Sequence, residues 1–120
     1  MSRLDEDLVM KQEYELWEAA KMSNPTVFER HLGPYVNVVC NYYRCSGREY
    51  VMTLPSYHLQ CYNIEQYETV SVSENRIQNY YLVNSRIAAS EEIMTCHVTS
   101  TWKKMTNGWK IVFHMRALIN

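Results

Sequence analysis

His114 and Arg116 stand two residues apart near the end of the sequence. Side chains at this spacing on a β-strand point to the same face of the sheet, so the pair predicts an imidazole beside a guanidinium. A guanidinium inside a protein needs an anion or an acidic partner, and its planar fork suits a carboxylate. Imidazole acts as a base near neutral pH or as a hydrogen-bond donor. The two residues therefore predict a site for a small polar or anionic ligand.

Each of these residues also has a structural interpretation. His114 can be a hydrogen-bonded core histidine, and Arg116 can pair with a glutamate such as Glu18 or face solvent. Cys40 is a further candidate, because a histidine beside it would lower its pKa and make it a nucleophile. Without such a histidine, Cys40 is a small buried hydrophobe.

Aromatic residues complete the set of candidates. Ten tyrosines are many for 120 residues, and Tyr14 and Tyr42 are predicted to line a pocket with their rings and hydroxyl groups. The remaining histidines, His31, His58 and His97, show no ligand spacing with one another or with cysteine. We therefore predict no metal site and no cofactor.

The face on which these side chains lie depends on one hairpin. Asn107-Gly108 tolerates positive φ and is flanked by alternating β-branched and aromatic residues, which predicts two strands and a tight turn. A two-residue loop puts Trp102 on one face with the set Trp109, Ile111, Phe113 and Met115, and His114 and Arg116 on the other. A three-residue loop puts Ser100 and Trp102 with His114 and Arg116, opposite that set. The turn itself leaves both registers open.

Caps and periodicity predict the helices. Ser2 and Asp5 resemble a capping box before an amphipathic helix over 3–22, and Asn24-Pro25 begins a second helix over 25–32. Pro55 argues against an uninterrupted helix or a central strand around it, so we expect only a short helix over 56–60.

Alternation of apolar and polar residues predicts the strands, over 35–44, 62–73, 76–89, 93–105 and 109–119. The expected fold is an α+β domain with an antiparallel sheet of four or five strands and its helices on one face.

Composition excludes several classes of function. The net charge is −1 with 21% charged residues, which does not suit binding of nucleic acid, and no apolar run is long enough to span a membrane. The acidic first residues do not suit a secretory signal, so we expect a cytoplasmic protein. The length fits a single domain over 1–120, and the four cysteines without a C-x-x-C pair are expected to be free thiols.

The last hairpin carries a pattern, Trp102-x6-Trp-Lys-Ile-Val-Phe-His-x-Arg116, that resembles the nuclear transport factor 2-like superfamily. That superfamily includes ketosteroid isomerase-like, SnoaL-like and calmodulin-dependent kinase association domains, and the hairpin is most similar to the last of these. The resemblance covers nearly the whole chain, and 16–20 before Asn24 is similar to the first helix of the family. It implies a cone-shaped, strongly bent antiparallel sheet wrapped around N-terminal helices, also called cystatin-like.

The resemblance further implies a pocket between the concave face of the sheet and the helices. In the association domains the residues that match Ser100 and Arg116 point into this pocket, which selects the three-residue loop. The position of the isomerase general base falls on Cys40, and no aspartate follows Asp7, so the catalytic sets of the family are missing. Members usually dimerise through the convex face, which would carry Trp109, Ile111, Phe113 and Met115.

We therefore expect a non-catalytic homodimer that binds a small polar or anionic ligand through Arg116, His114, Ser100, Trp102, Tyr14 and Tyr42. The alternative is an isomerase, cyclase or hydrolase of a hydrophobic small molecule that uses His114 or Cys40. A third interpretation is an assembly module like the kinase hub.

Overall fold

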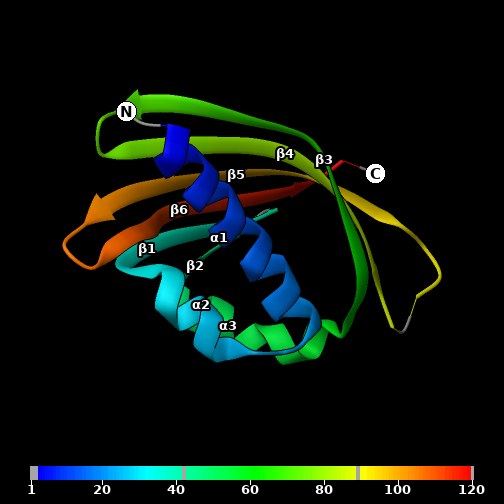
Figure 1. Cartoon of the computed structure of the whole chain (residues 1–120). Helices are drawn as coiled ribbons and strands as arrows, with labels where there is room; N and C mark the ends of the chain where they lie inside the picture. The colour runs from blue at the N-terminus through cyan, green and yellow to red at the C-terminus, as the bar shows by residue number, and fades with distance from the viewer. Residues whose placement is uncertain (1–2, 42, 89, 120) are drawn as a thin grey trace.

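The structure is a computed structural model that describes residues 3–41, 43–88 and 90–119. Its elements follow in the order α1 (Arg3–Lys21), α2 (Pro25–His31), β1 (Leu32–Cys40), β2 (Tyr43–Ser46), α3 (Gly47–Tyr57), β3 (Leu59–Ser73), β4 (Arg76–Ile87), β5 (Met94–Met105) and β6 (Gly108–Leu118) (Figure 1). No described helix is both long enough and apolar enough to cross a membrane.

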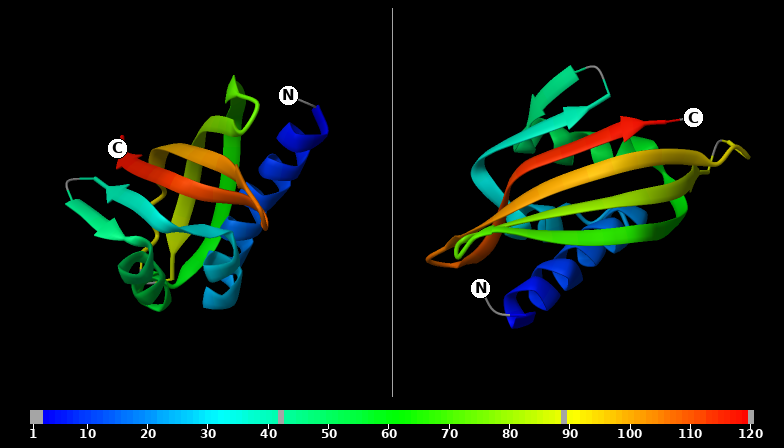
Figure 2. Two further views of the ribbon diagram at one scale, coloured as in Figure 1. Left: turned by 90° about the vertical axis from the view of Figure 1, so that its left-hand side faces the viewer. Right: turned by 90° about the horizontal axis from the view of Figure 1, so that it is seen from above.

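Six strands form one curved sheet in the order β2-β1-β6-β5-β4-β3. All neighbouring strands are antiparallel except β1 and β6, which run parallel. The long strands bend around α1, which lies along the concave face, and α2 and α3 lie beside β1 and β2 at its lower side (Figures 1 and 2). This arrangement leaves the convex face of the sheet without a helix.

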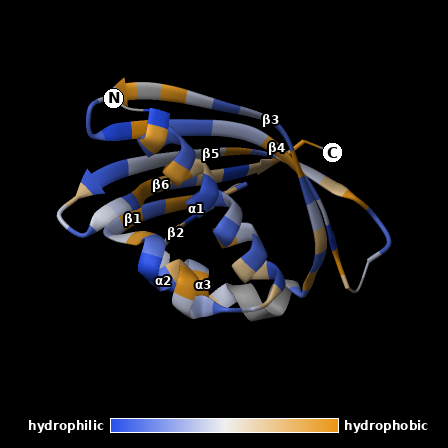
Figure 3. Ribbon diagram, viewed as in Figure 1, coloured by the Kyte–Doolittle hydropathy of each residue, from blue (hydrophilic) through white to orange (hydrophobic). Residues whose placement is uncertain are grey.

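Alternation along the strands explains which face is buried. In β4 every second residue from Ile77 to Ser85 is buried, and β5 shows the same period from Cys96 to Trp102. Figure 3 shows hydrophilic and hydrophobic residues interspersed along the strands. Val9 and Leu16 of α1 pack against these residues at the helical spacing that the sequence predicts. The core therefore lies between α1 and the concave face.

The helices α1 and α2 begin and end close to where the sequence predicts. Asp5 and Glu6 lie in the first turn of α1, where acidic groups favour a helix N-terminus. Asn24 caps α2 because its side chain accepts a hydrogen bond from the backbone N–H of Thr26 at 3.2 Å. A local cap therefore begins α2, whereas Ser2, predicted to cap α1, lies outside the described residues.

The predicted strand over 35–44 and the predicted helix over 56–60 were wrong. The strand ends at Cys40, and Asn41, with φ of 53°, turns the backbone into β2. Ser46 and Glu49 then form a capping box that begins α3, with N···O distances of 3.0 and 3.1 Å. Pro55 falls in the last turn of α3, so it did not prevent the helix.

The register of the β5–β6 hairpin changes along its length. Met105 pairs with Gly108 around Thr106-Asn107, and Trp102 pairs with Ile111. A β-bulge at position 112 then shifts the pairing, so that Ser100 lies opposite His114. Both ends of β6 therefore present residues to the concave face.

The bulge corrects one prediction about the convex face. Trp109 and Ile111, which we expected there, are 3% and 1% exposed and pack beside Trp102 in the core. Phe113 and Met115, beyond the bulge, lie on the opposite side of the sheet from His114 and are half-buried. A uniform register could not have produced both placements.

Candidate functional site

A pocket of about 150 Å³ lies between the concave face and the helices. Most of its wall is apolar, with Leu16, Trp17, Ala20, Phe28, Tyr50, Leu59, Ile87, Met94 and Leu118 among its residues. Glu13, His114 and Arg116 bring three titratable groups to the same wall. An apolar cavity with a few polar groups is typical of a site for a small molecule.

His114 has one nitrogen bound inside the protein and one without a partner. Its Nδ1 lies 2.9 Å from Ser100 Oγ, and its buried Nε2 has no hydrogen-bond partner among the described residues. Burial and the charge of Arg116 lower its pKa to about 3, so the imidazole is neutral at physiological pH. A neutral imidazole with a spare nitrogen is a ready contact for a ligand.

Arg116 is half-buried on the same strand face as His114. Its Nη2 lies 3.9 Å from Cys40 Sγ, and its guanidinium carbon lies 6.0 Å from the centre of the Tyr50 ring. Glu18, the acidic partner considered for it, accepts a hydrogen bond from the Tyr62 hydroxyl at 2.8 Å. Arg116 is among the residues of the pocket wall, so its guanidinium brings a positive charge to a mostly apolar surface.

Glu13 is the functional residue that sequence reasoning missed. The side chain is 0% exposed, and its carboxylate accepts hydrogen bonds from Tyr81 Oη (2.7 Å), Ser100 Oγ (3.0 Å) and Trp102 Nε1 (2.8 Å). Burial raises its pKa, and these hydrogen bonds oppose that rise. Its position four residues after Val9 on the buried stripe of α1 was the available signal.

Ser100 and Trp102 have a different place from the one predicted. Both are fully buried behind the pocket wall, where they bind Glu13. Tyr14 is 40% exposed and packs on the ring of Tyr67, with 6.0 Å between ring centres, away from the described pocket residues. Tyr42, also predicted to line the pocket, lies outside the described residues.

Cys40 lines the pocket and is buried. The Cys40 thiol lies 3.9 Å from Arg116 Nη2, but among the described residues no histidine forms a hydrogen bond to it, so the general base expected beside a nucleophilic cysteine is missing. The other three cysteines are also free thiols. Among residues 3–41, 43–88 and 90–119, no group of histidine, cysteine and acidic side chains is arranged to hold a metal ion.

No family model and no curated protein sequence matches this chain. Solved structures do match it. A nuclear transport factor 2-like protein from Cytophaga hutchinsonii aligns with 99% of this chain and 100% of its own, at 13% identity and a TM-score of 0.83. A protein from Novosphingobium aromaticivorans described as a candidate scytalone dehydratase aligns with 98% of this chain and 85% of its own, at 14% identity and a TM-score of 0.79. A candidate calcium/calmodulin-dependent kinase II association domain from Exiguobacterium sibiricum aligns with 90% of each chain, at 15% identity and a TM-score of 0.75.

This chain has the nuclear transport factor 2-like fold. The predicted fold, an α+β arrangement with a bent sheet around N-terminal helices, is confirmed, although the sheet has six strands instead of four or five. Identities this low show the fold and leave the activity to be argued from the site.

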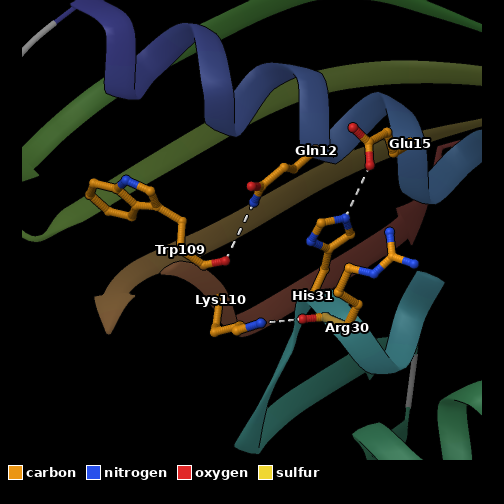
Figure 4. Close-up of polar contacts among 6 residues, drawn as sticks. All are labelled: Gln12, Glu15, Arg30, His31, Trp109 and Lys110. Atoms are coloured by element: carbon orange, nitrogen blue, oxygen red, sulfur yellow. Dashed lines mark hydrogen bonds and ion pairs between the residues drawn. The ribbon is translucent and has the colours of Figure 1, made fainter. Parts of the chain in front are cut away.

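A second histidine of this chain has a structural role. His31 Nε2 lies 3.2 Å from Glu15 Oε2, which joins α2 to α1 (Figure 4). Next to it, the Lys110 ammonium donates to the carbonyl of Arg30, and Gln12 donates to the carbonyl of Trp109 at 3.4 Å. This cluster ties both helices to β6, and neither His31 nor Glu15 is among the described residues that line the pocket.

Proposed function

We propose that the pocket binds a small apolar acid or a related polar compound, with the polar group held at Arg116 and His114. The observation that carries this proposal is the unpartnered, buried Nε2 of His114 on an otherwise largely apolar pocket wall that also holds the Arg116 guanidinium. Guanidinium is the side chain best suited to a carboxylate, and the apolar wall would hold a hydrocarbon body.

The size of the pocket limits the ligand. An apolar cavity of about 150 Å³ is known to hold benzene, so a ligand of roughly six to twelve non-hydrogen atoms is the best fit here. A single aromatic ring with one polar substituent meets this limit. A skeleton of three or more fused rings exceeds it, which argues against a steroid-sized substrate.

Benzoate is the probe that tests the proposal. Replacing Arg116 with glutamine keeps a polar side chain but removes the charge, so benzoate affinity should fall about tenfold to a hundredfold. Titration calorimetry measures this, and benzyl alcohol, which has no charge, should lose much less.

Arg44→Gln is the matched control, because Arg44 is an exposed arginine on β2 outside the described pocket wall. Unchanged benzoate affinity in Arg116→Gln, or an equal loss in Arg44→Gln, would contradict a role of Arg116 in binding.

A second candidate function is proton-transfer chemistry on a ligand in the same pocket, as in an isomerase or a dehydratase. The position of the His114 Nε2 favours it, because a neutral imidazole nitrogen that meets the ligand is the usual general base. Faster turnover of a single-ring ketone by the protein than by buffer, lost in His114→Gln, is the expected result. A rate that is the same in that variant would exclude this role.

The convex face supports a proposal about assembly. Val39, Phe113 and Met115 lie together on the adjacent strands β1 and β6, on the face that carries no helix, and each is partly exposed. We propose a two-fold dimer through this face, because a second copy would cover its apolar area.

A further inference from the structure

We propose that Glu13, Ser100 and His114 form a proton relay, here called the Glu13 relay, which sets whether His114 Nε2 accepts or donates a hydrogen bond in the pocket. In its resting state the site selects neutral ligands that carry an N–H or O–H group, and a carboxylate binds only together with one proton. This inference deepens the proposed function and rests on it, since both kinds of ligand occupy the same pocket.

The three side chains are in continuous hydrogen-bond contact. His114 Nδ1 lies 2.9 Å from Ser100 Oγ, and Ser100 Oγ lies 3.0 Å from Glu13 Oε2. Ser100 and Glu13 are fully buried and His114 is 6% exposed, so bulk water does not compete for these bonds. Only Nε2 of His114 is left without a partner.

With Glu13 ionised in the resting state, the direction of the hydrogen bonds follows from groups that can only donate. The Trp102 indole donates to Glu13 Oε1, and the Trp17 indole donates to the Tyr81 oxygen at 2.6 Å, which leaves the Tyr81 proton for Glu13 Oε2. A carboxylate that receives these donors also accepts the Ser100 proton. Ser100 must then accept from Nδ1–H of His114, and Nε2 presents a lone pair to the pocket.

A carboxylate ligand cannot bind to that lone pair, because both partners would be acceptors. Binding therefore requires a proton from solvent and reversal of the relay. Glu13 becomes a carboxylic acid that donates to Ser100, Ser100 donates to Nδ1, and Nε2–H donates to the ligand. The reversal forms an O–H bond at Glu13 and an N–H bond at Nε2 and breaks the N–H bond at Nδ1, so the net gain is the one proton taken up from solvent. Ser100 gives its proton to Glu13 and receives the proton of Nδ1.

Charge and burial favour Glu13 as the place where this proton is held. The titratable groups of the described residues around the relay and the pocket are Glu13 on α1, Cys40 on β1, Tyr43 and Cys45 on β2, Tyr50 on α3, Tyr67 on β3, Tyr81 on β4, Cys96 on β5 and Arg116 on β6. Burial and Arg116 both oppose a charged imidazole at His114, whereas burial favours the neutral, protonated form of Glu13. The reversed relay thus removes a buried negative charge at the moment when an anion binds beside Arg116.

Benzoate and indole test the two states. Indole is neutral, fits the same volume and can only donate, so it should bind the resting state with no proton uptake. Benzoate stays ionised in water between about pH 6 and pH 8, so its affinity should fall about tenfold per pH unit if one proton binds with it. Calorimetry in two buffers of different ionisation enthalpy should count about one proton per benzoate.

Glu13→Gln should fix the relay in its reversed state. The Trp102 indole can only donate, so it holds the glutamine carbonyl, and the amide N–H groups then face Ser100 and Tyr81, whose hydroxyl proton must turn away from position 13. Benzoate should bind this variant without proton uptake or pH dependence. Indole should bind it about tenfold more weakly than the wild type, because two donors would meet. Loss of the Glu13 charge alone would leave indole unaffected.

Glu15→Gln is the matched control, because Glu15 lies on the same helix and binds a histidine outside the pocket. It should behave as the wild type with both probes. Ser100→Ala provides the second variant, in case Glu13→Gln folds poorly. It keeps the Glu13 charge but cuts the relay, so proton uptake should fall well below one per benzoate.

The outcomes separate this inference from the proposed function. If neither probe binds the wild type, the proposed function fails. If both probes bind, three results would overturn the Glu13 relay while the pocket still binds ligands. They are benzoate binding without proton uptake, uptake of about one proton in Ser100→Ala, and indole binding to Glu13→Gln as strong as to the wild type.

Discussion

His114 makes the folded protein sensitive to acid. Its pKa falls to about 3 on folding from an ordinary value of 6.5, because the ring is buried beside Arg116. Below about pH 6.5 the His114 imidazole is protonated in the unfolded chain but stays neutral in the folded protein. This contribution to stability is complete above the unfolded pKa and is lost as the pH falls toward 3, at roughly 1.4 kcal/mol per pH unit.

Glu13 acts in the opposite direction. Its pKa is raised above 4.5 by burial, so the folded protein binds this proton more readily than the unfolded chain. Its contribution is therefore greatest at low pH and is lost as the pH rises through the folded pKa. The two buried groups thus partly cancel in the pH profile of the wild type.

Replacing His114 with asparagine should separate these effects. The difference in free energy of unfolding between neutral pH and about pH 4.5 should become smaller, since the contribution of His114 is removed while those of Glu13 and of His31, whose pKa burial also lowers, remain. Urea denaturation at the two pH values measures it. His97→Asn, at an exposed histidine of β5, is the control and should keep the wild-type profile. If His114→Asn loses as much stability in acid as the wild type does, the low pKa assigned to His114 is contradicted.

At the scale of elements, α3 holds Tyr50 against the site. The Tyr50 ring centre lies 5.7 Å from that of His114, and α3 begins at Gly47, where the backbone passes close to β1. A Cβ at Gly47 would lie 2.5 Å from Val36 Cγ1, so a larger residue must displace one of the two elements. The position of this pocket wall therefore depends on one glycine.

Gly47→Ala should destabilise the fold by about 1–3 kcal/mol, because the added methyl group overpacks the contact with β1. Thermal unfolding followed by circular dichroism measures the change. Arg48→Ala, at the next and exposed position of the helix, should cost little. If the two variants melt together, the close approach at Gly47 does not limit packing.

Local signals in the sequence predicted α1, α2 and the two long hairpins, because caps and turn residues act within a few positions. They missed α3, because Pro55 is not typical of a helix interior, although Ser46 and Glu49 at its start have the spacing of a capping box. The parallel pairing of β1 with β6 and the bulge at position 112 depend on contacts distant in sequence. Because of the bulge, Trp109 and Ile111 lie in the core, whereas Phe113 and Met115 lie on the convex face where all four were predicted.

The candidate site was partly readable for the same reason. The spacing of His114 and Arg116 indicated that their side chains share a face of the sheet. The pairing of Ser100 with His114 and of Val98 with Arg116 agrees with this. The partners of Ser100 and Trp102 could not be predicted, since Glu13 reaches them from a helix almost ninety residues away. A glutamate on a buried helical stripe was visible, but polar residues on such stripes are usually explained only once their partners are known.

At the scale of the whole molecule, the convex face is the surface that should decide assembly. Met115→Glu places a charge among Val39 and Phe113, so it should shift a dimer to single chains at micromolar concentration. Light scattering measures the mass. Leu8→Glu, an exposed change on α1, is the control and should leave the mass unchanged. A wild-type mass of one chain would contradict the proposed dimer.

A crystal structure of the complex with benzoate is the most direct test of the proposed ligand position in the pocket. We expect one benzoate between α1 and the concave face. Its carboxylate should lie within hydrogen-bond distance of the Arg116 guanidinium and of His114 Nε2, and its ring should lie against the apolar wall that includes Leu16 and Phe28. Benzoate bound elsewhere, or in the pocket with its carboxylate turned away from both groups, would contradict it.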